Sequence, residues 1–200
     1  NLITKAGADR VVTVDLHAGQ IQGFFDIPVD NLFSTPIFAR HAKKNIKSKN
    51  IICVAPDVGG TERARALGKM LNSELAIVDK RRPKPGQSKV MNVIGDVKGK
   101  TCIIVDDIID SGGTIINAAK ALKDRGAKEV YVYITHGVLS GEAVDKIKKS
   151  VIRKLVITDT IDNHDKIKNV KNIEVLPIST LMGEAIKRIS NSTSVSDLFK

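Results

Sequence analysis

The fold is decided by one stretch of the sequence, Ile103-Ile104-Val105-Asp106-Asp107-Ile108-Ile109-Asp110-Ser111-Gly112-Gly113-Thr114-Ile115. Its apolar, β-branched first part predicts a buried parallel strand, which we expect to stop at the two adjacent carboxylates and pass into a Gly-containing turn. Ile115, Ala119 and Leu122 then recur at helical spacing, and Gly126 is well placed to end that helix. The sequence therefore predicts a binding loop between the carboxyl end of a strand and the amino end of a helix.

The chemistry of this loop favours a phosphorylated sugar. Unpaired N–H groups at the start of a helix favour an anion, and glycines let a phosphate approach the backbone closely. Ser111 and Thr114 can add hydroxyl donors. Asp106 and Asp107 would repel a bare phosphate, so the ligand should also carry sugar hydroxyls or a bound divalent cation. The alternative is a strand that ends in an ordinary capped helix, which has no need of paired acids before its turn.

Composition narrows the class of protein. Two hundred residues can bury a good-sized core, and the net charge of +10 fits anionic ligands, nucleic acid included. An aromatic content of 4% without Trp argues against nucleic acid as a partner. Cys53 and Cys102 lie in apolar strands without a CxxC pattern, which predicts buried thiols in a reducing compartment. With no membrane-spanning stretch and no signal peptide ahead of the first strand, we expect a cytoplasmic protein without a membrane partner.

The rest of the chain alternates predicted strands and helices. Strands are predicted over Val11–Val14, Ile51–Ala55, Glu74–Val78, Val130–Thr135, Leu155–Thr158 and Ile173–Pro177, a short strand and turn over Val93–Gly99, and helices over Pro36–Lys49, Thr61–Leu71, Gly141–Lys149 and Ser179–Ile189. The alternation predicts an α/β fold with a central parallel sheet and helices on both faces. We expect His41 to be exposed on its helix, His136 to cap its strand, and the polar loop Asp162–Asp165 to be solvated.

Acidic residues elsewhere are candidates for a metal site. Asp15 and His17 are expected on the same side of a strand end, where they could bind a metal directly, through water or through nucleotide phosphates. The alternative is a capped strand with a hydrogen-bonded His. Asp26 and Asp30 lie in a turn-rich stretch and could hold the metal's water shell, or simply be solvated. Asp57 follows another strand and precedes another helix, which makes it a second metal-site candidate.

Two groups of cations could meet phosphate. The segment Asp79-Lys80-Arg81-Arg82-Pro83-Lys84-Pro85-Gly86-Gln87-Ser88-Lys89 is denied regular structure by its Pro and Gly residues. It predicts a mobile basic flap, which would neutralise charge over a polyphosphate; the alternative is a solvated loop. Arg63 and Arg65, on the helix after Asp57, could touch phosphate, and a solvated helix face explains them about as well.

Four segments carry a family resemblance. Val105–Ile115 resembles the ribose-5-phosphate/diphosphoribosyl loop of the type I phosphoribosyltransferase fold. Val14–Asp26, Ala55–Gly60 and Asp79–Pro83 are similar, in the same order, to segments of the ribose-phosphate pyrophosphokinase family, the phosphoribosyl pyrophosphate synthetases. The similarity runs from the first residue to nearly the last.

The resemblance implies an activity and a role for each group. The family transfers the diphosphoryl group of ATP to the C1 hydroxyl of ribose 5-phosphate, which gives 5-phosphoribosyl 1-diphosphate and AMP. By resemblance the catalytic cations are Lys80 and Arg82, and Mg²⁺ is the cofactor, held through His17 and Asp57 with Asp15, Asp26 and Asp30. The implied ribose-5-phosphate-binding residues are Arg82, Asp106, Asp107, Asp110, Ser111, Gly112, Gly113 and Thr114.

The resemblance also bears on domain organisation. We expect residues 1–35 to be the remnant of a first phosphoribosyltransferase-like domain, 36–182 a second such domain, and 183–200 a C-terminal helix and tail. Asn1–Arg10 reads as the end of a helix, and the family has a domain-sized, ATP-binding segment before it, so we expect a truncated chain. Alone, it should bind ribose 5-phosphate weakly and turn over little or nothing. A homo-oligomer is expected, since the family commonly forms hexamers.

Two other functions remain open at this point. A phosphoribosyltransferase that consumes 5-phosphoribosyl 1-diphosphate would share the central loop, although the Asp15–Asp26 segment and the Lys80/Arg82 flap argue against it. A catalytically silent regulatory homologue would also share it, but such homologues tend to lose the flap cations or the loop acids. Release of AMP from ATP and ribose 5-phosphate would separate these readings.

Overall fold

The computed structural model describes residues 1–81 and 90–199, with the side chains of residues 80, 81 and 90 excepted. Its elements in chain order are α1 (Leu2–Lys5), β1 (Val11–Val14), η1 (Gly19–Phe24), β2 (Val29–Leu32), α2 (Thr35–Asn45), β3 (Ile51–Ala55), α3 (Thr61–Leu71), β4 (Glu74–Arg81), β5 (Val90–Ile94), β6 (Thr101–Ile109), α4 (Gly113–Asp124), β7 (Glu129–Gly137), α5 (Ala143–Lys148), β8 (Lys154–Thr158), α6 (His164–Ile167), β9 (Ile173–Leu176), α7 (Ser179–Ser190) and η2 (Ser196–Phe199).

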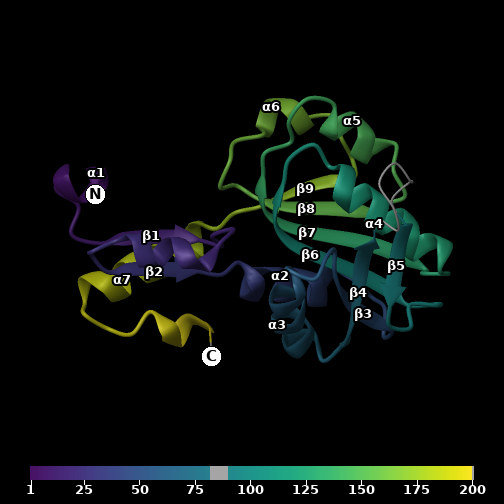
Figure 1. Cartoon of the computed structure of the whole chain (residues 1–200), viewed down its shortest axis with the longest axis horizontal. Coiled ribbons are helices and arrows are strands. Elements are labelled where there is room, and N and C mark those ends of the chain that lie inside the picture. The colour runs from purple at the N-terminus through teal and green to yellow at the C-terminus, as the bar shows by residue number, and fades with distance from the viewer. Residues whose placement is uncertain (82–89, 200) are drawn as a thin grey trace.

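The described residues form one large sheet with the strand order β5-β4-β3-β6-β7-β8-β9 (Figure 1). Every neighbouring pair is parallel except β4 and β5, which run antiparallel at one edge. The predicted α/β fold with a central parallel sheet is therefore confirmed. Because β3, β6 and β7 are parallel neighbours, their carboxyl ends deliver the loops that follow them to one edge of the sheet.

Helices cover both faces of this sheet, as predicted. Along β6, Cys102 and Ile104 belong to the core on one face, together with α4 and α5. Ile103 and Val105 alternate with them and pack on the other face, against α2 and α3. This burial on both faces explains why the strand reads as a continuous apolar run instead of an alternating one.

The strand β6 is longer than its apolar run suggested. It does not stop at Asp106 and Asp107 but continues to Ile109, because Asp106 stays paired with Ile134 and Ile109 with Gly137 of β7. The two carboxylates therefore lie inside a hydrogen-bonded ladder. Hydrogen bonding to a neighbouring strand is a tertiary effect that the local sequence does not reveal.

The ends of several other elements also differ from the predictions. α2 ends at Asn45, where Lys49 was predicted, and α5 covers only Ala143–Lys148. β4 continues beyond Val78 to Arg81 because it pairs with β5 in a hairpin-like arrangement. The first residues of the predicted flap, Asp79–Arg81, are thus strand. The rest of that segment, residues 82–89, lies outside the described part of the chain.

A second, smaller body contains both ends of the described chain (Figure 1). β1 and β2 form a parallel pair, with Val11 opposite Val29 and Val14 opposite Leu32. Leu32 packs against Leu181 and Ala185 of α7, so the last helix lies on the first strands. The domain boundaries expected after residues 35 and 182 stay predictions. Within residues 1–81 and 90–199, no helix combines the length and the apolar character needed to cross a bilayer.

Two polar side chains that were expected in solvent are buried. The His41 side chain on α2 is 11% exposed; its Nδ1 lies 2.9 Å from the Tyr133 hydroxyl and its Nε2 3.1 Å from Glu174. Asn163 is buried and donates a hydrogen bond to the Gly137 carbonyl at 2.6 Å. The expectation for His41 was wrong, and that for the polar loop was wrong at Asn163 alone, since Asp162, His164 and Asp165 are exposed. The partners of His41 and Asn163 lie far away in the sequence, on β7 and β9.

Candidate active site

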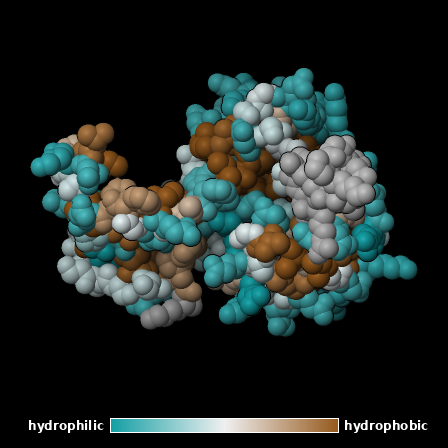
Figure 2. Space-filling view, in the orientation of Figure 1, coloured by the Kyte–Doolittle hydropathy of each residue, from teal (hydrophilic) through white to brown (hydrophobic). Residues whose placement is uncertain are grey.

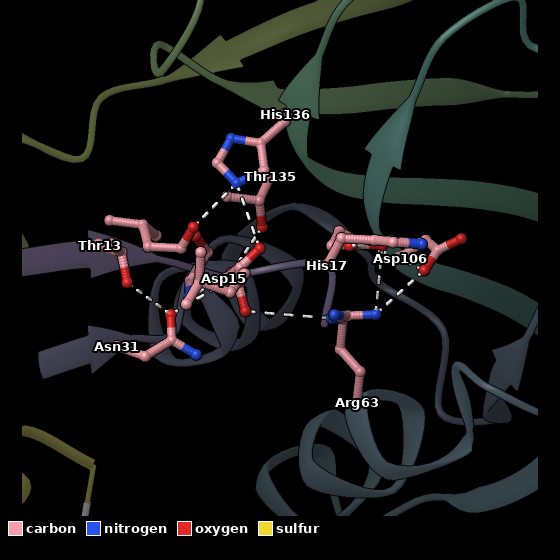
Figure 3. Close-up of polar contacts among 12 residues, drawn as sticks. Thr13, Asp15, His17, Asn31, Arg63, Asp106, Thr135 and His136 are labelled. Atoms are coloured by element: carbon pink, nitrogen blue, oxygen red, sulfur yellow. Dashed lines mark hydrogen bonds and ion pairs between the residues drawn. The ribbon is translucent and has the colours of Figure 1, made fainter. Parts of the chain in front are cut away.

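The centre of the site is the acid pair, Asp106 and Asp107, near the carboxyl end of β6; Figure 3 shows Asp106 with Arg63 and His17 beside it. Arg63 of α3 reaches both: its Nη1 lies 3.0 Å from Asp106 Oδ1 and 3.5 Å from Asp107 Oδ1. His17, from the segment after β1, places Nδ1 2.7 Å from Asp107 Oδ2. The Asp107 side chain is only 3% exposed, whereas that of Asp106 is 20% exposed. Three separate segments therefore meet at the two carboxylates.

The acid pair holds a proton more firmly than free carboxyls do. Burial, followed by the proximity of Asp107, raises the pKa of Asp106 to about 7. Burial alone would also raise the pKa of Asp107, but the hydrogen bond from Asp106 and the attraction of Arg63 outweigh it, and the pKa of Asp107 is lowered. Near neutral pH the pair can therefore offer both a hydrogen-bond donor and several acceptors, which suits sugar hydroxyls.

Arg63 has a role that the sequence did not reveal. It was expected either to touch phosphate or to be solvated, but its guanidinium lies against the acid pair, and its Nε is 4.0 Å from Asp15 Oδ1. Arg65, two residues further on, is exposed and has no ion pair among the described residues. The signal that could have distinguished them is helical phase, because Ala64 and Leu67 are buried and place Arg63 nearer the sheet.

The loop that follows β6, Asp110–Thr114, is called here the β6–α4 loop. Its Gly112 has φ +78°, a left-handed conformation that favours glycine, and it immediately precedes α4. Among the described residues no side chain caps this helix, while Ser111, Gly113 and Thr114 are exposed. They line a hollow of about 590 Å³ that extends along α4 to Asp124 and Arg125. The predicted anion-binding geometry, an open helix start with hydroxyls and glycines, is present.

Asp15 and His17 are not arranged as the strand pattern predicted. β1 ends at Val14, and Asp15 has φ +44°, which breaks the alternation. Asp15 is 2% exposed, and its Oδ2 accepts hydrogen bonds from Ser34 N at 2.9 Å and Thr135 Oγ1 at 2.7 Å. The His17 side chain is 79% exposed and turns to Asp107. The two side chains thus lie in different environments, one buried and one open.

The remaining acidic candidates make contacts of their own, separate from the acid pair. Asp57 Oδ1 accepts a hydrogen bond from Gly60 N at 3.0 Å, in the turn before α3. Asp30 is ion-paired with Arg10, and Asp26 is exposed in the turn before β2. Over residues 1–81 and 90–199, no three His, Cys, Asp or Glu side chains are grouped so that they could hold a metal ion. Mg²⁺ commonly takes one or two protein ligands and completes its shell with phosphates and water, so an exposed imidazole beside an acid pair fits a cation that arrives with phosphate.

The two predicted catalytic cations are not tested by the described residues. Lys80 is placed by its backbone in β4, opposite Met91 of β5, and its side chain is outside the described part. Arg82 lies outside the described residues altogether. Their roles stay predictions.

His136 does more than cap a strand. It lies within β7, opposite Ile108, and its Nε2 is 2.9 Å from the Val14 carbonyl oxygen. Its Nδ1 is 3.0 Å from Thr160 Oγ1. The expected cap was wrong because β7 runs on to Gly137 and the imidazole reaches across to the segment after β1.

The mostly parallel sheet, with an acid pair and an open, glycine-containing helix start at its carboxyl edge, agrees with the type I phosphoribosyltransferase-like fold that the sequence resembles. A family model described as "Phosphoribosyl synthetase-associated domain" matches residues 69–200. The chain belongs to this family.

Known relatives agree with this placement. The chain is 62% identical over 200 residues to the ribose-phosphate pyrophosphokinase of Hyphomonas neptunium, and 60% identical over 199 residues to that of Rhizobium meliloti. Both alignments cover 100% of this chain and 64% of the relative. The crystal structure of phosphoribosylpyrophosphate synthetase from Mycobacterium smegmatis superimposes with a TM-score of 0.87 at 38% identity, over 96% of this chain and 62% of that one. The chain thus spans about two thirds of the length of these proteins.

Proposed function

We propose that this chain works as part of a ribose-phosphate diphosphokinase, which converts ATP and ribose 5-phosphate to 5-phosphoribosyl 1-diphosphate and AMP. The observation that carries the proposal is the acid pair on β6 beside the open start of α4, in a chain about 60% identical to ribose-phosphate pyrophosphokinases. In this reaction the C1 hydroxyl oxygen of the sugar bonds to the β-phosphorus of ATP. The bond from that phosphorus to the α,β-bridging oxygen breaks, AMP leaves, and the hydroxyl proton is released.

The sugar phosphate would bind across β6 and α4. The backbone N–H groups and hydroxyls of Ser111–Thr114 would hold the 5-phosphate, because Ser111, Gly113 and Thr114 are exposed at a helix start that no side chain of the described residues caps. Asp106 and Asp107 would hold the ribose hydroxyls, which need both a donor and acceptors. Asp110 is exposed at the same loop and would complete the sugar site with Arg82.

The ATP phosphates would lie on the side of His17. Its Nδ1 is engaged by Asp107, so Nε2 is the nitrogen left for a ligand or its water shell. Mg²⁺ would neutralise the negative charge of the phosphates. We propose that the residues around it are His17 and Asp57, with Asp15, Asp26 and Asp30. Lys80 and Arg82 would stabilise the charge on the transferring group. No covalent intermediate with the protein is needed.

Formation of AMP tests the proposal. The 200-residue chain and a chimera that adds the part of the Hyphomonas neptunium relative outside the alignment would both be incubated with ATP, Mg²⁺ and ribose 5-phosphate. We expect equal amounts of AMP and 5-phosphoribosyl 1-diphosphate from the chimera and little from the chain alone. Consumption of 5-phosphoribosyl 1-diphosphate with a nucleobase would favour a phosphoribosyltransferase instead, and sugar binding without turnover in the chimera would favour a regulatory homologue.

We propose in addition that the protein is a homo-oligomer, a hexamer by family resemblance, that works in the cytoplasm where ATP and ribose 5-phosphate are found. Light scattering after size exclusion, applied to the same chimera, measures the mass directly. A mass of one chain at micromolar concentration would contradict the oligomer.

A further inference from the structure

The smaller body is attached to the large sheet by a cluster of polar contacts. Asp15, directly after β1, accepts hydrogen bonds from Thr135 Oγ1 of β7 and from Ser34 N. His136, next to Thr135, places Nε2 2.9 Å from the Val14 carbonyl oxygen and 3.3 Å from that of Asp15. On the face shown in Figure 2, the junction between the two bodies is covered mainly by hydrophilic residues. The contact is therefore directional, and specific hydrogen bonds decide its geometry.

We infer that Thr135 and His136 are positioning residues that fix the turn Asp15–His17, so that the imidazole of His17 lies on Asp107. Asp15 is in this account the anchor of the turn, because its carboxylate accepts hydrogen bonds from Ser34 N and Thr135 Oγ1. The effect on turnover rests on the proposed function. The effect on the position of the turn does not.

The backbone of Asp15 is the first reason. Its φ of +44° is a left-handed conformation that a non-Gly residue keeps only where its surroundings hold it. Those surroundings are complete: its N–H donates to the Leu32 carbonyl oxygen at 2.8 Å and its carbonyl oxygen faces His136. Burying a carboxylate without hydrogen-bond partners costs free energy. The two donors on Oδ2 therefore hold the Asp15 side chain in place, in addition to the contacts of its backbone.

The hydrogen bond that His136 donates to the segment after β1 is the second reason. Its Nε2 faces two carbonyl oxygens, which are acceptors only, so Nε2 must carry the proton and donate it. Behind it, the hydroxyls of Thr158 and Thr160 lie 2.6 Å and 3.1 Å from the Thr135 carbonyl oxygen. These two hydroxyls bond to the backbone of β7 and not to the turn, so the side chains of Thr135 and His136 are the groups that join β7 to residues 14 and 15.

The exposure of His17 is the third reason. Its side chain is 79% exposed, and its only hydrogen bond among the described residues is with Asp107. Packing therefore does not hold the imidazole. Its place over the acid pair depends on where the turn begins, which the contacts of Asp15 determine (Figure 3).

Amide hydrogen exchange in this 200-residue chain tests the positional claim. The Ser34 amide reports directly on Asp15, and the Leu16 amide, which donates to Asn31 Oδ1 at 3.2 Å, reports on the turn. Thr135→Val removes the hydroxyl at nearly constant volume, Thr135→Ser keeps it, and Thr158→Val removes a neighbouring buried hydroxyl that does not touch Asp15. We expect exchange at Ser34 and Leu16 to rise at least tenfold in Thr135→Val, and to stay within threefold of the parent in the other two.

Global unfolding must be separated from local opening, so the exchange of a β8 amide, Leu155, serves as the internal reference in each variant. A rise at Ser34 that Thr158→Val matches, or one that follows Leu155, would overturn the inference. Unchanged exchange in Thr135→Val would also overturn it.

Turnover provides a second readout in the chimera. Thr135→Val should lower kcat at least tenfold while KM for ribose 5-phosphate stays within twofold, and Thr135→Ser should restore most of the rate. Equal kcat in Thr135→Val and Thr158→Val would contradict the positioning role. If the unmodified chimera formed no AMP, the proposed function would fail, and the exchange data would still decide the position of the turn.

Discussion

Two turns of the same design lie side by side at the carboxyl edge of the sheet, and they differ in how their backbone groups are used. The β3–α3 turn, Pro56–Gly60, is satisfied internally, because Asp57 accepts a hydrogen bond from Gly60 N. Neither α3 nor α4 has a side-chain cap, but Thr61 N also donates to the Val58 carbonyl oxygen at 3.3 Å, whereas among the described residues no turn or cap hydrogen bond uses the backbone N–H groups of residues 111–114. The difference teaches that a strand, an acidic turn and a helix do not by themselves make a ligand site; the site is where the donors are left open.

The space around one glycine in each turn shows the same difference between a closed and an open turn. A Cβ on Gly60 would meet Pro56 Cδ at 3.2 Å, so that glycine serves a close approach within the protein. A Cβ on Gly113 would have its nearest neighbour, Ser111 Oγ, at 4.0 Å. The protein itself does not require a glycine at position 113, and the space in front of it remains for a ligand.

The largest expected effect concerns Arg63, which lies on α3 just after the β3–α3 turn and reaches the acid pair just before the β6–α4 loop. Arg63→Met leaves the acid pair without its cation, and we expect the free energy of unfolding to fall by about 2–3 kcal/mol, because unpairing a largely buried carboxylate is costly. Arg65→Met, on the exposed side of the same helix, should change it by less than about 0.5 kcal/mol. Urea denaturation of both variants measures this, and equal losses would show that Arg63 is an ordinary surface residue.

The next effect sharpens the contrast between open and closed turns. Gly113→Ala should fold as well as the parent chain, but its methyl group would occupy the space where the 5-phosphate approaches the backbone. We expect the Kd for ribose 5-phosphate to rise at least tenfold, or about 1.4 kcal/mol. Isothermal titration calorimetry measures it.

A glycine elsewhere provides the control for that variant. Gly183 lies within α7, and a methyl group on its Cα would have no neighbour within 4 Å among the described residues, so Gly183→Ala should leave ribose 5-phosphate binding unchanged. Undiminished affinity in Gly113→Ala would show that the phosphate binds somewhere other than this loop.

A smaller effect is expected from the acid pair as the pH changes. The pKa of Asp106 is raised to about 7 in the folded protein, against about 3.9 for an unfolded chain. The folded state therefore holds the proton more tightly, so the contribution of Asp106 to stability is greatest below about pH 4 and is lost as the pH rises towards 7. In the variant Asp106→Asn this side chain no longer titrates, so its contribution to stability does not change with pH. Relative to the parent, the variant should gain about 1–2 kcal/mol between pH 4 and pH 8, and a stability difference independent of pH would contradict the shared proton.

The smallest effect belongs to the internally satisfied turn. Asp57→Ala removes one hydrogen bond to Gly60 N, which should cost about 0.5–1.5 kcal/mol of stability. Binding of ribose 5-phosphate without metal should stay within twofold of the parent. A tenfold weaker binding would mean that the β3–α3 turn belongs to the sugar site, and the comparison between the two turns would fail.

The sequence predicted what depends on local pattern. β3 and α3 occupy Ile51–Ala55 and Thr61–Leu71 as predicted, because strand alternation and helical periodicity are strong there. The loop chemistry at Gly112 and the helix end at Gly126, with φ +88°, also follow from local rules.

What the sequence could not predict depends on residues far apart along the chain. Asp106 and Asp107 looked like the start of a turn because their pairing with β7 is invisible in the local sequence. Arg63 and His136 looked like surface or capping residues because their partners come from other segments. The position of Asp15 depends on a hydroxyl 120 residues away. In each case a long-range polar contact outweighs the local pattern.

The central claim, that the β6–α4 loop and the acid pair bind a phosphopentose, is tested most directly by a crystal structure of the chain soaked in ribose 5-phosphate. We predict the 5-phosphate within hydrogen-bond distance of the backbone N–H groups of residues 111–114, and sugar hydroxyls on Asp106 and Asp107. An empty loop at saturating ligand, with those N–H groups bonded to the protein itself, would contradict the account.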